Sequence, residues 1–139
     1  MIEQTLLLIK PDGVARGLTE EILSKIESSG LIIKKKVKLT LSKDKAERLY
    51  AVHRGKKFYQ GLIKLITSGP LVATLIEGEN AVKKVRDLMG ETDPRKANPG
   101  TIRGDLKEEN VLTEDGIIKN IVHGSDSIET AREEIKIFF

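Results

Sequence analysis

The chain has 139 residues, no cysteine, and 24 Lys and Arg residues against 21 Asp and Glu, which gives a formal net charge of +3 at pH 7. This length suits one domain, residues 1–139, that buries a core without disulfide or metal support. The missing thiols exclude disulfides, zinc–thiolate sites and cysteine nucleophiles and fit a reducing cytoplasm, while the weak positive charge permits an anionic ligand but does not argue for nucleic acid.

The first half of the chain alternates between strand and helix patterns. Residues 3–9 form a continuous apolar run, too short to cross a membrane, and a Pro-Asp-Gly turn leaves Lys10 at its end. Residues 19–30 have a helical pattern that a glycine stops. Residues 31–41 alternate apolar and lysine side chains, which predicts a second strand with one solvated face.

The rest of the chain continues this alternation. The patterns predict, in order, a helical hairpin at 42–50 and 56–67, a strand at 71–77, a helix at 80–89, mostly loop at 91–116, a strand at 117–122 and a C-terminal helix to residue 137.

The order of elements predicts an α+β domain. We expect a ferredoxin-like two-layer sandwich, in which helices cover one face of a four-stranded antiparallel sheet, with an added C-terminal helix. A parallel doubly wound sheet is an alternative that the periodicity does not exclude. Neither fold specifies a function by itself.

The segment 120–127, Asn-Ile-Val-His-Gly-Ser-Asp-Ser, carries the clearest chemical signal. It sets His123 after an apolar run and just before a helix start, where Gly124 lets the backbone turn and the serines offer helix caps. Unpaired amides and the positive end of the helix dipole favour an anion there, so the imidazole is predicted to face a phosphate. A structural histidine with a satisfied hydrogen bond is the alternative interpretation.

Common phosphate-binding motifs are missing, since the sequence has no GxxxxGK[ST] loop, no GxGxxG after a strand and no kinase HRD or DFG signature. The remaining candidates are cations at strand ends or beside loops: Lys10, Arg86 and Arg103. Arg offers a bidentate fork and Lys a compact charge to a transferring phosphoryl group. Each cation alone is weak evidence, because most of the 24 Lys and Arg residues must be solvated.

Five separated segments resemble the nucleoside diphosphate kinase family, and they occur in the same order along the chain. They are TLLLIKPDGV with RGL (5–14 and 16–18), TSGP (67–70), GETDP (90–94), PGTIRGD (99–105) and NIVHGSDS (120–127). The resemblance implies a ping-pong phosphotransferase, in which His123 accepts the terminal phosphate of a nucleoside triphosphate, typically ATP, and passes it to a different nucleoside diphosphate.

The resemblance also implies the roles of the other site residues. The catalytic set is His123, Lys10 and Glu134, with Glu134 as the carboxylate set against the imidazole. The nucleotide-binding set is Lys10, Tyr50, Phe58, Leu62, Arg86, Thr92, Arg103 and Asn120, of which Phe58 and Leu62 line the base. These two lie one helical turn apart and share a face, although a core stripe is the favoured interpretation without the family. His53 flanks the same cleft and is not expected to be catalytic.

Magnesium is expected to arrive on the nucleotide, because no cluster of carboxylates in the sequence suits it. The expected partners are nucleoside di- and triphosphates and further copies of the chain, in a tetramer or hexamer built from dimers, with no membrane and no specific nucleic acid. The alternative functions are a histidine phosphocarrier and a ferredoxin-like binding module. A carrier has no need of three cations and a base-lining helix, and the few aromatic residues argue against an RNA-reading sheet.

The chain departs from the family pattern in two places. Lys57 stands where relatives commonly have proline, and the segment between Arg103 and Asn120 is several residues longer than in most relatives. Apolar pairs at 111–112 and 117–118 flank a turn containing Asp-Gly, which predicts a small hairpin at the end of the extended loop 105–116. We expect this insertion to pack against a neighbouring subunit; a mobile surface loop is the alternative.

Overall fold

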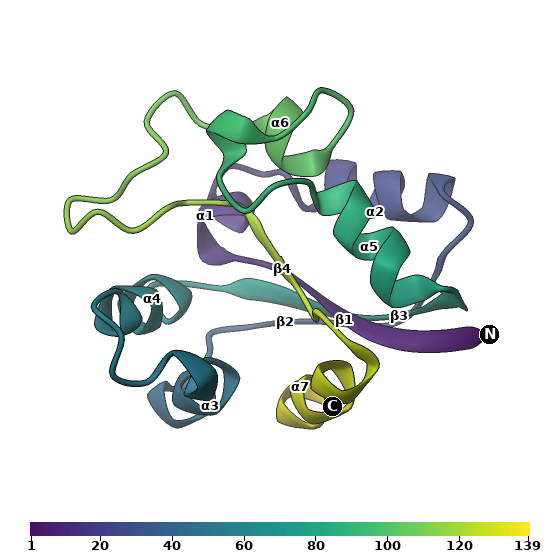
Figure 1. The fold of residues 1–139 in the computed structure, drawn as a ribbon, viewed down its shortest axis with the longest axis horizontal. Helices are drawn as coiled ribbons and strands as arrows, with labels where there is room; N and C mark the ends of the chain where they lie inside the picture. The colour runs from purple at the N-terminus through teal and green to yellow at the C-terminus, as the bar shows by residue number, and fades with distance from the viewer.

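The computed structural model describes residues 1–139 and contains one four-stranded sheet in the order β2-β3-β1-β4, with every neighbouring pair antiparallel (Figure 1). The strands are β1 (Ile2–Ile9), β2 (Ile32–Leu39), β3 (Leu71–Glu79) and β4 (Val122–Gly124). The helices are α1 (Pro11–Ala15), α2 (Thr19–Ser28), α3 (Lys43–Leu49), α4 (Tyr59–Ile66), α5 (Ala81–Met89), α6 (Ile102–Leu106) and α7 (Ile128–Phe138), with short 3-10 helices at Ala51–His53 and Pro94–Lys96. The antiparallel pairing confirms the ferredoxin-like prediction and excludes the doubly wound alternative.

Strand β1 lies in the middle of the sheet and is apolar on both faces. Leu7 and Ile9 belong to one core cluster, Leu6 and Leu8 belong to the other, and all four side chains are fully buried. A sheet covered on one face only would leave one of these pairs in water, which would cost about 1.5–3 kcal/mol of folding free energy for each exposed side chain. The composition of β1 therefore requires a cover on both faces.

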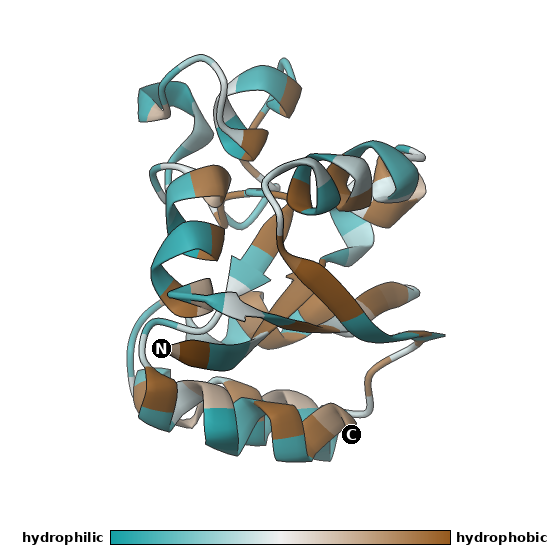
Figure 2. Ribbon diagram, turned by 90° about the vertical axis from the view of Figure 1, so that its right-hand side faces the viewer, coloured by the Kyte–Doolittle hydropathy of each residue, from teal (hydrophilic) through white to brown (hydrophobic).

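Helices supply that cover on both faces of the sheet (Figure 1). Helices α1, α2, α5 and α6 contribute to one core cluster, and α3, α4 and α7 contribute to the other. The prediction of helices on one face holds for the crossover helices α2 and α5, but the added C-terminal helix shares the opposite face with the α3–α4 hairpin. In Figure 2 the strands carry long hydrophobic stretches, whereas the helices alternate between hydrophobic and hydrophilic residues, as expected for helices with one face on the sheet.

Strand β2 forms an edge of the sheet and pairs only with β3. A bulge between Ile33 and Lys35 shifts its register, and its lysines are solvated, as predicted. The predicted apolar face, formed by Ile33, Val37, Leu39 and Leu41, is only partly buried, since 37% of Val37 stays exposed and only Leu41 is fully buried. Ile32, which is not part of that face, is 56% exposed. This strand therefore leaves one row of backbone groups and two apolar side chains uncovered within a single chain.

Strand β4 does not lie at residues 117–122, where the apolar run predicted it. It spans Val122–Gly124, because Ile121 adopts a left-handed φ of 73° and ends the extended segment before it. His123 thus lies inside the strand, opposite Leu8 of β1. Gly124 is needed for close packing and not for a turn, since a Cβ there would lie 2.4 Å from the sulfur of Met89.

The predicted hairpin in the extended loop is confirmed. Leu112 and Ile118 form an antiparallel bridge, the amide of Thr113 donates to the carbonyl of Ile117 at 2.9 Å, and Gly116 has a left-handed φ of 79° in the turn. The tip reaches helix α4 of the same chain, where a Cβ on Gly61 would lie 2.3 Å from Ile117 Cγ1. Part of its apolar side is thereby covered within the chain, and packing against a second subunit stays a prediction.

Replacing Gly61 by alanine tests whether this hairpin depends on α4. Gly→Ala inside a helix ordinarily stabilises a protein by about 0.5–1 kcal/mol. Here the new methyl group must displace Ile117, so we expect no gain in thermal stability and faster hydrogen exchange at the amides of Thr113 and Ile117. Gly69→Ala is the control, since a Cβ at Gly69 meets nothing within 4 Å. A stabilised Gly61→Ala protein with unchanged exchange would contradict the docking.

No helix of the chain combines the length and the hydropathy that crossing a membrane requires.

Candidate active site

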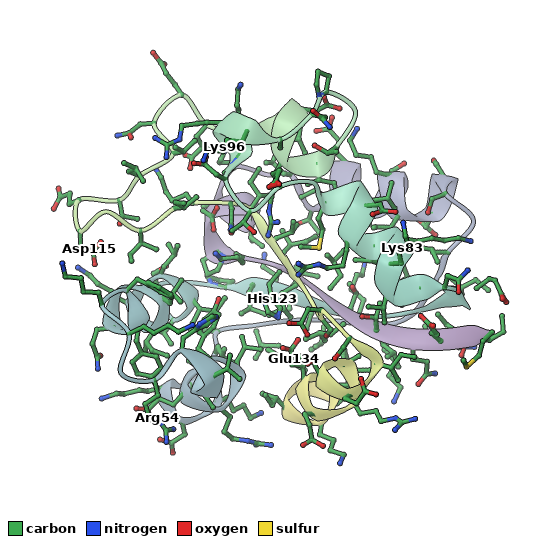
Figure 3. The ribbon with its side chains drawn as sticks, viewed as in Figure 1. Arg54, Lys83, Lys96, Asp115, His123 and Glu134 are labelled. Carbon is green, nitrogen blue, oxygen red and sulfur yellow. The ribbon has the colours of Figure 1, made fainter.

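His123 and Glu134 form the centre of the site, and their side chains point toward one another in Figure 3. His123 Nε2 lies 2.9 Å from Glu134 Oε1, and the Ser125 hydroxyl donates to the same oxygen at 2.7 Å. Because Glu134 is 92% buried and accepts from both groups, it holds the proton of the neutral imidazole on Nε2. In this tautomer the free lone pair of the ring is on Nδ1.

The surroundings of His123 differ from the predicted helix start. Helix α7 begins at Ile128 and is capped by the side chain of Ser127, which accepts from the amide of Thr130. The imidazole therefore contacts a carboxylate in the middle of α7 instead of free amides at its first turn. The predicted carboxylate partner is in contact, and the attraction of a phosphate by the helix N-terminus stays a prediction.

Tyr50 lies edge-on to the His123 ring, with ring centroids 6.2 Å apart and an interplanar angle of 86°. It follows α3 directly and is buried. Burial and then the carboxylates of Asp12 and Glu134 raise the pKa of its hydroxyl above the ordinary value, so the phenol stays a neutral hydrogen-bond donor.

Lys10 and Arg103 are buried cations anchored to the segment before His123. Lys10 Nζ donates to Asn120 Oδ1 at 2.8 Å. Arg103, on the short helix α6, donates from Nε to the Asn120 carbonyl at 3.0 Å and from its two terminal nitrogens to the carbonyls of Val122, at 2.7 Å, and Gly90, at 3.1 Å. Three of the five guanidinium N–H groups are used, so two remain for an anion.

Burial dominates the electrostatics of both cations. It lowers the pKa of Lys10 from 10.5 to about 8, with Asp12 raising that pKa and Arg103 lowering it further. It also lowers the pKa of Arg103 to about 10, helped by the like charge of Arg86 and opposed by Asp12. Two cations held this close together, and away from water, favour a bound polyanion.

Arg86 and Thr92 lie at the rim of the site. Both are exposed, Arg86 donates to the carbonyl of Gly124 at 3.3 Å, and the carbonyl of Thr92 accepts from Asn120 Nδ2 at 3.1 Å. Asn120 thereby connects Lys10, Arg103 and Thr92, which come from three separate parts of the chain.

A row of rings leads from His123 to the predicted base wall. His53 lies between Tyr50, at 6.1 Å between ring centroids, and Phe58, at 5.4 Å. Phe58 caps α4 and is 42% exposed, and Leu62, one turn later, is half-buried. The helix begins at Tyr59, three residues after the predicted start, and still leaves Phe58 and Leu62 on one face.

Two residues of the site were not identified from the sequence. Asp12 was interpreted as a turn residue, yet its Oδ2 accepts from the amide of Ile121 at 2.9 Å. Ile121 was interpreted as a strand residue, yet it is the turn that precedes β4. The only local signal was the position of Asp12 two residues after Lys10. In addition, no three His, Asp or Glu side chains gather into a set that could hold a metal ion.

Comparison with known proteins agrees with this geometry. Residues 3–139 match the family model described as nucleoside diphosphate kinase. The chain is 50% identical to nucleoside diphosphate kinase from Wolinella succinogenes, covering 99% of this chain and 96% of that one, and 50% identical to the enzyme from Staphylothermus marinus, covering 99% and 92%.

Solved structures give the same result. The transition state mimic of nucleoside diphosphate kinase from Borrelia burgdorferi with bound vanadate and ADP superposes with a TM-score of 0.92 at 32% identity, covering 99% of this chain and 87% of that one. The Halobacterium salinarum enzyme in complex with CDP has a TM-score of 0.91 at 39% identity, covering 100% and 88%. Neither a phosphocarrier nor a binding module is favoured by such matches, and the chain belongs to the nucleoside diphosphate kinase family, as an enzyme that transfers phosphate between nucleotides.

Proposed function

We propose that His123 carries the phosphoryl group in this reaction and that its Nδ1 is the nucleophile. The bond between Nε2 and Glu134 supports this assignment, because it leaves Nδ1 with a free lone pair and stabilises the positive charge that develops on the ring. Nδ1 attacks the terminal phosphorus of the nucleoside triphosphate, and the bond to the bridging oxygen breaks with release of the diphosphate. A terminal oxygen of a second diphosphate then attacks the same phosphorus, and the P–N bond breaks.

Lys10, Tyr50 and Arg103 stabilise the phosphoryl group during both steps in this proposal. Tyr50 packs edge-on against the imidazole, and Lys10 and Arg103 are hydrogen-bonded to the segment that leads into His123. The donors that these two cations keep free suit the charge spread over the phosphoryl oxygens. Arg86, Thr92 and Asn120 bind the remaining phosphates and the sugar at the rim. Phe58 and Leu62 offer the base a flat apolar face that discriminates little between bases.

Magnesium fits this site as part of the nucleotide. The residues around His123 include three cations and no set of carboxylates for a metal, so protein ligands for Mg²⁺ are few. Mg²⁺ bound to the phosphates would screen their charge while the residues of the chain hold them in place.

We also propose a cytoplasmic homo-oligomer, a tetramer or hexamer built from dimers. The uncovered edge of β2, with Ile32 and Val37 exposed, supports contacts with a second copy. A cytoplasm rich in nucleoside triphosphates suits an enzyme without cysteines. The mass of the protein in solution, and the effect of shortening residues 107–115 on it, measure the oligomer and the contribution of the hairpin.

The pure protein incubated with ATP and magnesium should gain one acid-labile phosphate, which GDP then removes as GTP. Intact mass before and after GDP measures the adduct, and peptide mapping under alkaline conditions locates it. An adduct on another residue, or transfer without any adduct, would contradict the role of His123.

Arg103 is expected to serve both the fold and the reaction. Arg103→Ala removes three hydrogen bonds to carbonyls, and only the carbonyl of Asn120 keeps another known donor, the amide of Val122. The loss should destabilise the protein by about 2 kcal/mol or more, at about 1–3 kcal/mol for each buried group left without a donor. It should also lower kcat at saturating nucleotide. Arg103→Lys keeps the charge without the planar fork and should recover only part of both losses. An effect confined to KM would show uniform binding instead.

A further inference from the structure

Asp12 lies within the site and has no part in the proposed reaction. It is the second residue of α1, and its Oδ2 accepts from the amide of Ile121 at 2.9 Å. Its Oδ1 is buried and has no hydrogen-bond partner. A buried carboxylate oxygen without a partner destabilises a fold, so its presence beside two buried cations calls for an explanation in the site.

Ile121 has the least favourable backbone in the chain. Its φ is 73°, and a β-branched residue in this region is strained. Three contacts hold it there: Asp12 accepts from its amide, its carbonyl accepts from the amide of Lys10 at 2.8 Å, and Gly13 leaves room for its side chain. A Cβ on Gly13 would lie 2.9 Å from Ile121 Cγ2. Such strain persists only where the surroundings impose it.

The turn at Ile121 determines where the reactive groups lie. It directs the carbonyls of Asn120 and Val122, on either side of it, to Arg103. The same turn places the Asn120 side chain on Lys10 and starts β4, whose second residue is His123. The conformation of this one residue therefore fixes two cations and the proposed nucleophile relative to one another.

We propose that Asp12 is a positioning residue for phosphoryl transfer, which holds the amide of Ile121 and so keeps Lys10 and Arg103 aimed at the phosphate beside His123. This inference rests on the proposed role of His123. The charge of Asp12 acts in the same direction, since it raises the pKa of Lys10, whereas burial and the like charge of Arg103 from α6 lower it. Tyr50, from the end of α3, also faces Asp12 and is neutral at the relevant pH.

Two substitutions separate the hydrogen bond from the charge. Asp12→Asn keeps a carbonyl oxygen for the amide of Ile121 and removes the charge, whereas Asp12→Ala removes both. Asp44→Ala is the matched control, because Asp44 is likewise the second residue of a short helix, α3, but is exposed and its side chain forms no hydrogen bond or ion pair. The three proteins are compared in thermal unfolding, kcat, KM and the pH dependence of kcat.

Asp12→Ala should lower kcat at saturating nucleotide by about tenfold or more, with KM changed less than threefold, because positioning acts in the transition state. Asp12→Asn should keep most of the wild-type kcat in mildly acidic buffer, and its rate should fall at a lower pH than that of the wild type. Ile121→Gly adopts the left-handed turn without strain. In that background Asp12→Ala should therefore lower kcat by a smaller factor.

The role is wrong if both Asp12 variants match Asp44→Ala in kcat and pH profile, or if Ile121→Gly leaves the effect of Asp12→Ala unchanged. If Asp12→Ala does not fold, Asp12→Glu decides instead, because it keeps the charge and moves the acceptor relative to the amide of Ile121; a kcat equal to that of the wild type then overturns the proposal. A wild-type protein that forms no phosphohistidine with ATP would instead contradict the proposed function of His123.

Discussion

Replacing His123 by alanine is expected to abolish both the phosphoenzyme and the transfer of phosphate from ATP to GDP. The loss in kcat should reach about 10⁴-fold or more, as for other enzymes deprived of their nucleophile. We expect no second side chain to take its place, because Glu134 accepts from Ser125 and Asp12 holds the amide of Ile121. The remaining nearby groups are cations and a neutral phenol. Incorporation of phosphate from ATP and the rate of GTP formation measure the two effects.

His53→Ala is the matched control for this variant. His53 belongs to the same row of rings as His123. Partial burial, Lys56 and His123 lower its pKa, so it offers a second neutral imidazole close to the site. The Nδ1 of His53 forms a hydrogen bond with Lys56, and the ring has no carboxylate partner. We therefore expect His53→Ala to keep most of the wild-type turnover. A phosphorylated His123→Ala protein that loses its phosphate to GDP would show that another residue is the nucleophile.

The sequence was informative where the chemistry depends on residue type. Lys10 and Asn120 are 110 residues apart, yet their side chains lie 2.8 Å from one another, and both occur in segments that resemble the family. Glu134 was predicted to contact the imidazole and does so. A role that requires a charge, a ring or a carboxylate restricts a position to few residue types. Residues with such roles can therefore be predicted from the sequence alone.

Features imposed by tertiary contacts could not be predicted in the same way. The left-handed turn at Ile121 contradicts the strand propensity of isoleucine, and its cause lies in Asp12 and Gly13, more than 100 residues away in sequence. For the same reason the apolar run at 117–122 was interpreted as one strand, although Ile117 belongs to a hairpin that packs on α4. A short apolar run predicts that its residues are buried. Its backbone conformation, strand or turn, depends on the tertiary contacts that the residues make.

The second layer of helices has a different explanation. The pattern of α3 and α4 predicted two amphipathic helices but not the face of the sheet that they cover. The decisive observation is the continuous apolar run in β1, which buries Leu6 and Leu8 beneath α3, α4 and α7. A run without alternation predicts two covered faces. The sequence of β1 therefore indicates helices on both faces of the sheet, whereas a two-layer sandwich has them on one face only.

Replacing Lys10 by methionine is expected to inactivate the enzyme and to stabilise the fold. Burial lowers the pKa of Lys10 from 10.5 to about 8. Since one pKa unit corresponds to about 1.36 kcal/mol, the charged Lys10 destabilises the folded state by about 3 kcal/mol at neutral pH. Methionine fills a similar space without that charge. Because Asn120 loses its donor, the net gain should be about 1–3 kcal/mol in urea unfolding at neutral pH.

The pH dependence of that gain identifies its cause. Below pH 8 Lys10 is charged in both states and the difference between the variants is constant; between about 8 and 10.5 the unfolded chain binds the extra proton, so wild-type stability rises with pH and the difference shrinks. The wild-type rate should fall over the same range, as the cation that stabilises the phosphoryl group is lost. Lys57→Met, at an exposed position without partners, should show neither effect.

A Lys10→Met protein that is less stable than the wild type at neutral pH would contradict this prediction. It would mean that the contacts of Lys10 stabilise the fold by more than the burial of its charge destabilises it, so that the site holds its phosphate-binding charge without a loss of stability.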